Sequence, residues 1–188
     1  MSKKYALVID LKRCVGCRTC TVACKMENNV PLGISRMRVF NNEGNLHFDR
    51  PTGNYPDLKL YWTPVPCMHC EEPVCVKACP SGALYKRDDG IVYLDKSKCV
   101  GCRYCSWVCP YDVPQFDAEQ GVSDKCTLCA HRVEKGEKPM CVICCPARAI
   151  YFGDLGDPTS EVSKLLSKRK NKVLLPEQGT HPQTRYLF

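Results

Sequence analysis

Short apolar runs alternate along the chain with segments that are rich in cysteine, glycine and proline. The run YALVID at 5–10 is almost wholly apolar, which predicts a buried strand. The stretches GALYK at 82–86 and IVYLD at 91–95 lie on either side of an Asp-Asp-Gly turn, and this is the pattern of a β-hairpin. Further strands are expected where β-branched and aromatic residues gather, at 36–40 (RMRVF), 58–62 (LKLYW) and 149–153 (AIYFG).

The pattern changes after residue 153, where the cysteines end. Asp157 is suited to the N-cap of a helix and Pro158 to its first position. The residues 173–188 contain two prolines and no helical period, so they predict an extended strap over the body or over a partner. The simple alternative is a solvated charged helix followed by a loosely packed tail. Apolar residues on one face of the expected helix are Val162, Leu165 and Leu166.

Cysteine accounts for 17 of the 188 residues. Such a density is otherwise typical of small secreted proteins that are held together by disulfides. This chain is too long for that class, its cysteine count is odd, and no secretory signal precedes Cys14. No apolar run approaches the roughly 18 residues that would span a bilayer. We therefore expect reduced, metal-binding thiolates in a chain that folds in the cytoplasm and does not itself span the membrane.

Sixteen of the cysteines fall into four groups of four. The groups are Cys14, Cys17, Cys20 and Cys24; Cys67, Cys70, Cys75 and Cys79; Cys99, Cys102, Cys105 and Cys109; and Cys126, Cys129, Cys141 and Cys145.

The four groups are of two repeated kinds. The second and fourth groups correspond, because Pro73 and Pro139 each stand two residues before a cysteine and CPSGALY matches CPARAIY. The first and third groups align without a gap, and three pairs of residues correspond in them: Asp10 and Asp95, Gly16 and Gly101, Arg18 and Arg103.

The order of groups and strands matches a circular permutation. The expected hairpin alone joins groups two and three, so residues 67–109 form one compact unit. Group four is followed by a strand and group one is preceded by one, and joining those ends would reproduce the compact unit. The sequence thus predicts an α+β fold of two bacterial-ferredoxin-like units, one inserted into the other, with a C-terminal extension. The expected domains are 1–62 with 118–153, the inserted unit 63–117, and the extension 154–188.

The run C-x2-C-x2-C-x3-C is the bacterial ferredoxin arrangement, in which the fourth cysteine ligates the other cluster of a pair. Cys24, which is expected to begin a helix and to point away from its own loop, therefore joins group four. Four [4Fe-4S] clusters in two pairs are predicted. Their ligand sets are Cys14, Cys17, Cys20 and Cys145; Cys24, Cys126, Cys129 and Cys141; Cys67, Cys70, Cys75 and Cys109; and Cys79, Cys99, Cys102 and Cys105.

Zinc is the alternative metal, because C-x2-C pairs also build zinc ribbons. Zinc sites use two such pairs for each ion, whereas groups one and three place three cysteines close together before a fourth. This spacing, with the Cys-Pro endings of groups two to four, favours iron–sulfur clusters.

The polypeptide has a net charge of +7, to which the charge of the predicted clusters must be added. Each oxidised four-iron cluster with four thiolates carries about −2, so four of them contribute about −8. The basic residues then mainly compensate buried negative charge, and the one-sided basic face of a nucleic-acid binder is not expected. Basic residues that flank ligands either stabilise the clusters or face solvent or a partner: Arg18, Lys25, Arg103 and Lys125.

Several residues near the ligands have alternative roles. Cys144 is expected to be a small buried hydrophobic residue, with a reactive thiol or substitute ligand as the alternative. His69 is expected in an exposed loop, although a hydrogen bond to a cluster sulfur would raise the reduction potential. Tyr104 and Trp107 are expected in the core, with a place between a cluster and a partner's cofactor as the alternative.

The sequence has no G-x-S-x-G motif, Walker loop or Gly-rich dinucleotide fingerprint, so a non-catalytic electron carrier is expected. The four-group pattern over residues 5 to about 153 resembles the iron–sulfur B subunits of dimethyl sulfoxide reductase-family molybdopterin oxidoreductases. KCTLCAHRVEKGEKPMC and LLPEQGTHPQTRYL look closest to the polysulfide and thiosulfate reductase branch, with arsenate reductases nearby. Some relatives have tryptophan and a three-iron cluster where this chain has Cys102, so the resemblance implies four four-iron clusters.

The resemblance also implies partners and a location. In this family the subunit relays electrons between a molybdenum or tungsten catalytic subunit and a membrane quinone-reactive subunit or another donor, in anaerobic respiration. Family members often cross the membrane already folded on the partner's signal, so a membrane-associated complex on the periplasmic side is compatible with this chain. The alternatives are a subunit of a formate dehydrogenase or hydrogenase complex, or a free-standing multi-cluster ferredoxin.

Overall fold

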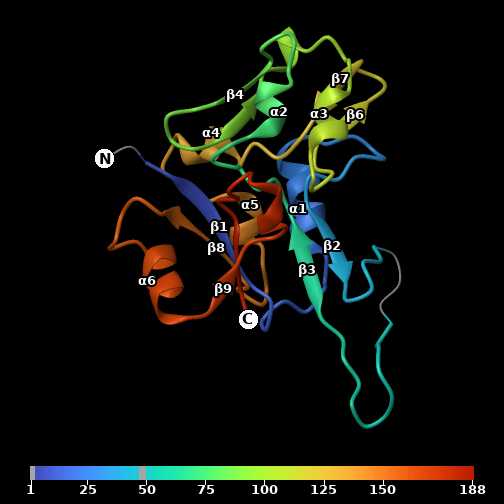
Figure 1. Ribbon diagram of the computed structural model, residues 1–188, viewed down its shortest axis with the longest axis vertical. Helices are drawn as coiled ribbons and strands as arrows, with labels where there is room; N and C mark the ends of the chain where they lie inside the picture. The colour runs from blue at the N-terminus through green and yellow to red at the C-terminus, as the bar shows by residue number, and fades with distance from the viewer. Residues whose placement is uncertain (1–2, 47–49) are drawn as a thin grey trace.

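A computed structural model of the protein describes residues 3–46 and 50–188 (Figure 1). Its strands are β1 (Tyr5–Asp10), β2 (Arg38–Asn41), β3 (Trp62–Val65), β4 (Leu84–Lys86), β5 (Val92–Leu94), β6 (Gln115–Asp117), β7 (Val122–Asp124), β8 (Ile150–Asp154), β9 (Asn171–Lys172) and β10 (Arg185–Leu187). Its α-helices are α1 (Thr19–Glu27), α2 (Val74–Lys77), α3 (Tyr104–Val108), α4 (Ala130–Val133), α5 (Met140–Ile143) and α6 (Glu161–Lys168), and short 3-10 turns cover Lys96–Lys98 and Pro176–Gln178.

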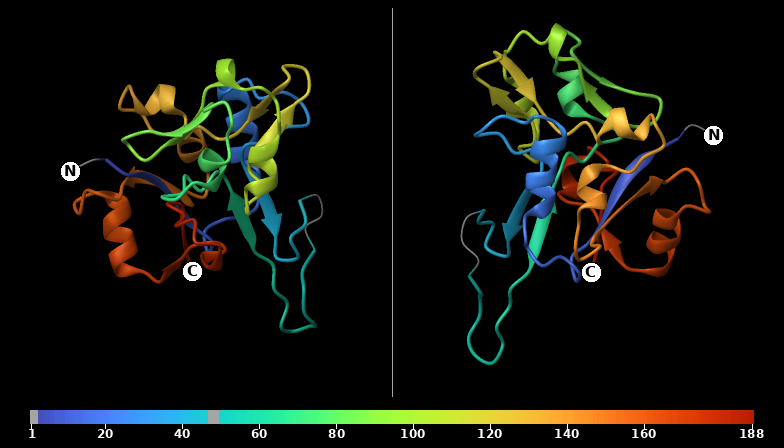
Figure 2. Two further views of the ribbon diagram at one scale, coloured as in Figure 1. Left: turned by 45° about the horizontal axis from the view of Figure 1, so that its top comes forward. Right: turned by 180° about the vertical axis from the view of Figure 1, so that it is seen from behind.

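The largest sheet has four strands in the order β8-β1-β10-β9. β1 runs antiparallel to β8, with Ile9 opposite Ile150, so the two strands predicted at 5–10 and 149–153 are confirmed as neighbours. α6 packs beside β8 (Figure 2), and its Val162 is buried against Val8 and Leu187. A side chain at Gly153 would collide with Val162 at 2.8 Å, so this close approach of helix and strand depends on glycine.

A second body of short elements lies above this sheet in Figure 1. The predicted hairpin is confirmed as β4 and β5, in which Leu84 pairs with Leu94. The short helices α2 and α3 pack against each other, as α1 and α5 do beside the larger sheet. The hairpin of β6 and β7 is an element that the sequence pattern did not predict.

The strand predicted at 58–62 is displaced. β3 begins at Trp62, where it pairs with Asn41 of β2, and it continues to Val65. Leu58 and Tyr61 are instead exposed, in the long extension that projects between β2 and β3 (Figure 1). Among the residues that the structure describes, the backbone of this apolar run has no strand partner beyond an isolated bridge between Thr52 and Lys59, so the run lies on the surface of the extension.

The C-terminal helix begins later than predicted. Asp157 does not cap it, because its carboxylate accepts hydrogen bonds from the backbone N–H of Thr159 at 2.8 Å and from the Thr159 hydroxyl at 2.7 Å. This local Asx turn delays the helix to Glu161, and Ser160 caps it by accepting from the N–H of Ser163 at 3.2 Å. The apolar face is confirmed, since Val162 is fully buried and Leu165 packs beside it.

The tail predicted as a strap is extended, but it belongs to the core. β10 lies between β1 and β9 as an inner strand, parallel to β1. Tyr186 and Leu187 are fully buried, and the Tyr186 hydroxyl donates to the Pro64 carbonyl oxygen at 2.9 Å. The tail therefore joins the large sheet to the β2–β3 pair. Among the described residues, no helix is long and apolar enough to cross a membrane.

Candidate iron–sulfur centres

Two cavities are each bordered by four cysteines from two distant groups. One cavity is lined by Cys67, Cys70, Cys75 and Cys109. The other is lined by Cys14, Cys17, Cys20 and Cys145. In each set the fourth cysteine comes from the other group of its pair, as the ferredoxin arrangement requires.

The third set gathers around the C-terminal end of α1. The Asn28 side-chain amide lies 3.7 Å from the sulfur of Cys24 and 3.7 Å from the sulfur of Cys129, so one donor reaches both. Burial raises the pKa of Cys141 well above its ordinary value, and the neighbouring thiols Cys126, Cys129 and Cys24 raise it further. Four sulfurs from groups one and four thus lie near one another.

The fourth set lies beside the β6–β7 hairpin. Ser123 contacts two of its members, since its backbone N–H donates to the Cys99 sulfur at 3.4 Å and its hydroxyl lies 3.3 Å from the Cys105 sulfur. Cys79 packs against the same small core as Cys105 and Cys99. Cys102 is exposed.

The cysteine loops of groups one and three share an unusual backbone. Gly16 and Gly101 have φ of 67° and 69°, and Arg18 and Arg103 have φ of 58° and 62°. A side chain at Gly16 would lie 2.4 Å from the Trp62 ring. Left-handed residues at matching positions curl each loop tightly, and in the first loop Cys14, Cys17 and Cys20 border one cavity.

Helix α1 begins before Cys24, which corrects the sequence expectation. It starts at Thr19, so Cys20 and Cys24 lie one turn apart on the same helix. Cys20 faces the loop of group one, whereas Cys24 lies beside Cys126 and Cys129. One helix therefore carries candidate ligands of two different predicted sets.

The protein environment alone does not favour thiolates. Burial raises the pKa of Cys20 to about 12, and the Cys14 thiol contributes to that rise. Burial likewise raises the pKa of Cys75 to about 12. Cys79 is an exception: burial opposes ionisation, but backbone N–H groups, that of Leu84 foremost, lower its pKa. Since metal ligation requires thiolates, a bound cationic metal would supply the missing stabilisation.

Backbone amides are aimed at several of the sulfurs. The N–H of Leu128 donates to the Cys126 sulfur at 3.4 Å and the N–H of Ala149 to the Cys145 sulfur at 3.3 Å. Such donors are among the groups that set the reduction potential of a cluster. Among the described residues, no three Cys, His, Asp or Glu side chains converge tightly enough to hold a single metal ion.

His69 is buried, and its expected place in an exposed loop is wrong. Only 1% of the residue is exposed, and its Nδ1 accepts a hydrogen bond from the N–H of Val92 at 3.1 Å. Burial lowers its pKa well below the ordinary value, so the ring is neutral and carries its proton on Nε2. Within the described part of the chain that N–H has no hydrogen-bond partner.

Three other expectations are wrong. Trp107 is 83% exposed and Tyr104 is 49% exposed, so neither is a core residue. Cys144 is half-buried at the end of α5, with its sulfur 3.9 Å from the Thr19 carbonyl oxygen, and it is not a fully buried hydrophobic residue. Its thiol lies close enough to Cys20 to raise the pKa of that thiol.

Comparison with known proteins agrees with this class of site. Residues 58–155 and residues 13–84 each match a family described as a 4Fe-4S dicluster domain. Two dicluster domains account for four [4Fe-4S] clusters. The chain is thus an iron–sulfur electron carrier, which confirms the predicted cofactor and rejects zinc.

Relatives that match most of the chain identify its family more closely. The B subunit of sulfite dehydrogenase from Allochromatium vinosum is 45% identical over 98% of this chain and 82% of its own length. The B subunit of tetrathionate reductase from Salmonella typhimurium is 41% identical over 98% and 72% of the two chains. The B subunit of anaerobic dimethyl sulfoxide reductase from Escherichia coli is 40% identical over 84% and 77%. This chain belongs to the family of iron–sulfur B subunits of the dimethyl sulfoxide reductase type, and the predicted electron-transfer role is confirmed.

Proposed function

We propose that this protein relays single electrons between a molybdopterin-containing catalytic subunit and a membrane-anchored, quinone-reactive subunit of a respiratory reductase. The proposal is supported by the names of its relatives, which are subunits of sulfite, tetrathionate and dimethyl sulfoxide oxidoreductases. The observation that carries it is the pairing of cysteines from distant groups around two cavities. Bound clusters supply one-electron chemistry, and the protein supplies their spacing, burial and charge.

The ligand sets that we propose are the four predicted from the sequence. The two cavities support the sets that contain Cys14 and Cys67, because each cavity is bordered by all four proposed members of its set. The shared Asn28 contact supports joining Cys24 to Cys129. The contacts of Ser123 support joining Cys99 to Cys105, and Cys79 belongs with them through the shared core.

We also propose that residues 63–117 form a ferredoxin-like unit inserted into a second unit made of 1–62 and 118–153. The pairing of β1 with β8 supports the second unit, since it joins the start of the chain to the segment after group four. The packing of α1 against α5 supports it in the same way. The hairpin of β4 and β5, with α2 against α3, supports the inserted unit, and the four-strand sheet extends the outer unit into 154–188.

The surface suggests where electrons enter and leave. Cys17 and Cys102, which occupy matching positions in groups one and three, are both exposed. Exposed apolar residues stand beside them, with Val15 at 57% and Val100 at 68%. We propose that these two ends contact the redox partners, because apolar residues beside a cluster close to the surface provide a short path and a dry interface. The complex would lie at the membrane, on the periplasmic side if the subunit is co-exported with its catalytic partner.

The test is to purify the chain anaerobically with whatever binds it, and to measure iron, molybdenum or tungsten, and pterin. About sixteen irons per chain, four for each cluster, and a pterin-containing partner are expected. The isolated chain should accept electrons from a chemical reductant yet reduce no substrate with an artificial donor. Zinc, appreciably fewer irons, or turnover by the partner-free chain would contradict the proposal.

A further inference from the structure

Lys125 is a buried basic residue that is neither a proposed cluster ligand nor part of the proposed partner contacts. It follows β7 directly and precedes Cys126. The residue is 1% exposed and is one of the largest fully buried side chains in the described structure. Lysine is almost never fully buried unless a partner compensates its charge.

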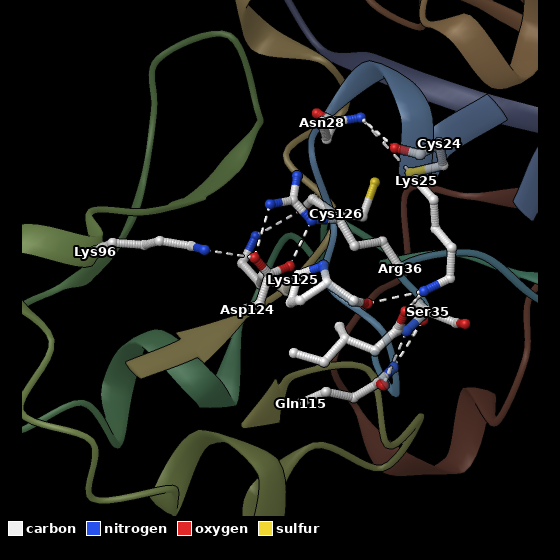
Figure 3. A network of polar contacts seen from close by, with 12 residues as sticks. Cys24, Lys25, Asn28, Ser35, Arg36, Lys96, Gln115, Asp124, Lys125 and Cys126 are labelled. Atoms are coloured by element: carbon white, nitrogen blue, oxygen red, sulfur yellow. Dashed lines mark hydrogen bonds and ion pairs between the residues drawn. The ribbon is translucent and has the colours of Figure 1, made fainter. Parts of the chain in front are cut away.

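The groups that hold the Lys125 ammonium are neutral. Its Nζ donates to the carbonyl oxygen of Cys126 at 2.9 Å and to the carbonyl oxygen of Val92. The preceding Asp124 is engaged elsewhere: its carboxylate pairs with Arg36 and with Lys96, the latter at 2.8 Å (Figure 3). In the part of the chain that the structure describes, no carboxylate forms an ion pair with Lys125. A buried ammonium with only neutral partners is costly, so an anionic group is expected beside it.

The proposed cluster ligands supply that anion. Lys125 lines the cavity that Cys67, Cys70, Cys75 and Cys109 border. Burial raises the pKa of the Cys67 and Cys126 thiols, and the charge of Lys125 opposes this rise at both. Cys67 and Cys126 belong to different proposed clusters, and their thiols are near enough to interact. The ammonium therefore lies where two ligand sets meet.

We propose that Lys125 sets the reduction potentials of the two middle clusters, by holding one fixed positive charge between the set that contains Cys67 and the set that contains Cys126. This inference rests on the ligand sets of the proposed function. Each added electron makes a cluster more negative, and a nearby cation in a medium of low polarity stabilises that reduced form. A cation shared by two neighbouring clusters raises both potentials together, so that neither becomes a barrier to the electron passing between them.

Lys98 provides a matched control within the same chain. It stands immediately before Cys99, as Lys125 stands immediately before Cys126. Its side chain is 64% exposed and lies 3.8 Å from Asp95. Water and salt screen an exposed charge, so removing it should hardly move the potential of the adjacent cluster.

The experiment compares Lys125→Gln, Lys125→Arg and Lys98→Gln in the full chain with its clusters bound. Each variant is titrated potentiometrically, its clusters are followed by electron paramagnetic resonance, and its iron content is measured. Signals are assigned to ligand sets with Cys24→Ser and Cys109→Ser. In Lys125→Gln, the ratio of reduced to oxidised middle clusters at a fixed potential should fall about tenfold, or about 59 mV for one electron. Lys125→Arg and Lys98→Gln should stay close to wild type.

Five results separate the outcomes. Unchanged middle potentials in an iron-replete Lys125→Gln would overturn the inference, and so would an equal shift in Lys98→Gln. Lys125→Gln could also lose iron. In that case, full iron content and wild-type potentials in Lys125→Arg would support the need for a positive charge at this position. Loss of iron from both variants would overturn the inference. Fewer than four titrating centres in the wild-type chain would instead contradict the proposed function.

Discussion

The loop of residues 14–24 and the loop of residues 99–109 carry the same cysteine spacing in different surroundings. Both have a left-handed glycine and a left-handed arginine at matching positions, so the motif brings its own backbone shape. What lies behind the glycine differs: the Trp62 side chain behind Gly16, and the Gly121 carbonyl of the β6–β7 hairpin behind Gly101. The comparison teaches that the backbone conformation of the loop comes with the cysteine motif, whereas the residues that pack behind its glycine differ from one site to the other.

The two loops also differ at their far ends. α1 continues for 9 residues, and Cys24 at its second turn is buried, whereas α3 has 5 residues and ends before the half-buried Cys109. The longer helix lets Asn28 reach two sulfurs. Trp107 stands at the position that Val22 holds in the first loop, and both side chains are exposed, at 83% and 56%.

The largest expected effect comes from removing the fourth cysteine of each loop. We expect Cys24→Ser to alter the cluster of group four, and Cys109→Ser that of group two, while each loop keeps its own cluster. The reason is the crossed ligation of paired clusters. Iron content and electron paramagnetic resonance of each variant check this. Loss of only the cluster bound by Cys14, Cys17 and Cys20 in Cys24→Ser would contradict the crossing.

Substituting the two glycines should separate the effect of the left-handed backbone from the effect of the residues packed behind it. Gly101→Ala forces a methyl group to within 2.3 Å of a backbone oxygen, whereas Gly16→Ala meets a side chain that can move. Left-handed strain costs ~1–2 kcal/mol in either case, and the backbone collision adds ~1–3 kcal/mol in Gly101→Ala. Anaerobic unfolding, followed by loss of visible absorbance, should rank Gly101→Ala as the less stable.

Gly121→Ala is the control for that ranking. It has φ of 67° but open space where the side chain would lie, so it reports the strain alone. Equal destabilisation by Gly101→Ala and Gly121→Ala would mean that the collision is relieved at no cost.

The aspartates that precede the loops should differ in a pH-dependent way. Asp10 is 1% exposed; burial raises its pKa, but the ion pair with Arg169 and backbone N–H groups outweigh this and lower it. The pKa of the more exposed Asp95 is lowered first by the Ser97 hydroxyl. Because the pKa of each carboxyl is below its ordinary 3.8 in the folded protein, the ionised carboxylate stabilises the fold above that pH. This contribution is lost as the pH falls through the lowered pKa.

We therefore expect Asp10→Asn to cost about 2 kcal/mol at neutral pH, because a buried charged hydrogen-bond partner is lost. Asp95→Asn should cost less. The measurement is the ratio of variant to wild-type rates of cluster release, from neutral pH to below 3.8. The ratio for Asp10→Asn should approach one in acid; a ratio independent of pH would contradict the role of the carboxylate.

The smallest effect on stability is expected at the exposed end of the second loop. Trp107 is 83% exposed, so Trp107→Ala should change the free energy of unfolding by less than ~0.5 kcal/mol. If this end contacts a redox partner, the same substitution should weaken binding about tenfold or more, because exposed tryptophans are frequent interface hot spots. Val22→Ala is the matched change in the first loop. Calorimetry of the isolated chain and affinity for the co-purified partner separate the two effects.

The cysteine spacing and the apolar runs predicted the repeat and the β4–β5 hairpin, because both are local patterns. The permuted repeat in turn predicted that β1 and β8 are neighbours. The sequence missed the β6–β7 hairpin, although Gly121 offered a turn signal. It also misplaced His69 and Trp107, since burial depends on which distant segments cover a loop. The inner position of β10 has no local signature, because a three-residue parallel strand is specified by its neighbours.

The place of β10 constrains how the molecule is made. The ribosome releases β1 early, whereas the strand that completes its second edge is synthesised much later. Until then the nascent polypeptide carries an open edge that other chains can pair with, so a holding chaperone would protect it. The large sheet should therefore close only once β10 has been synthesised, after all four cysteine groups.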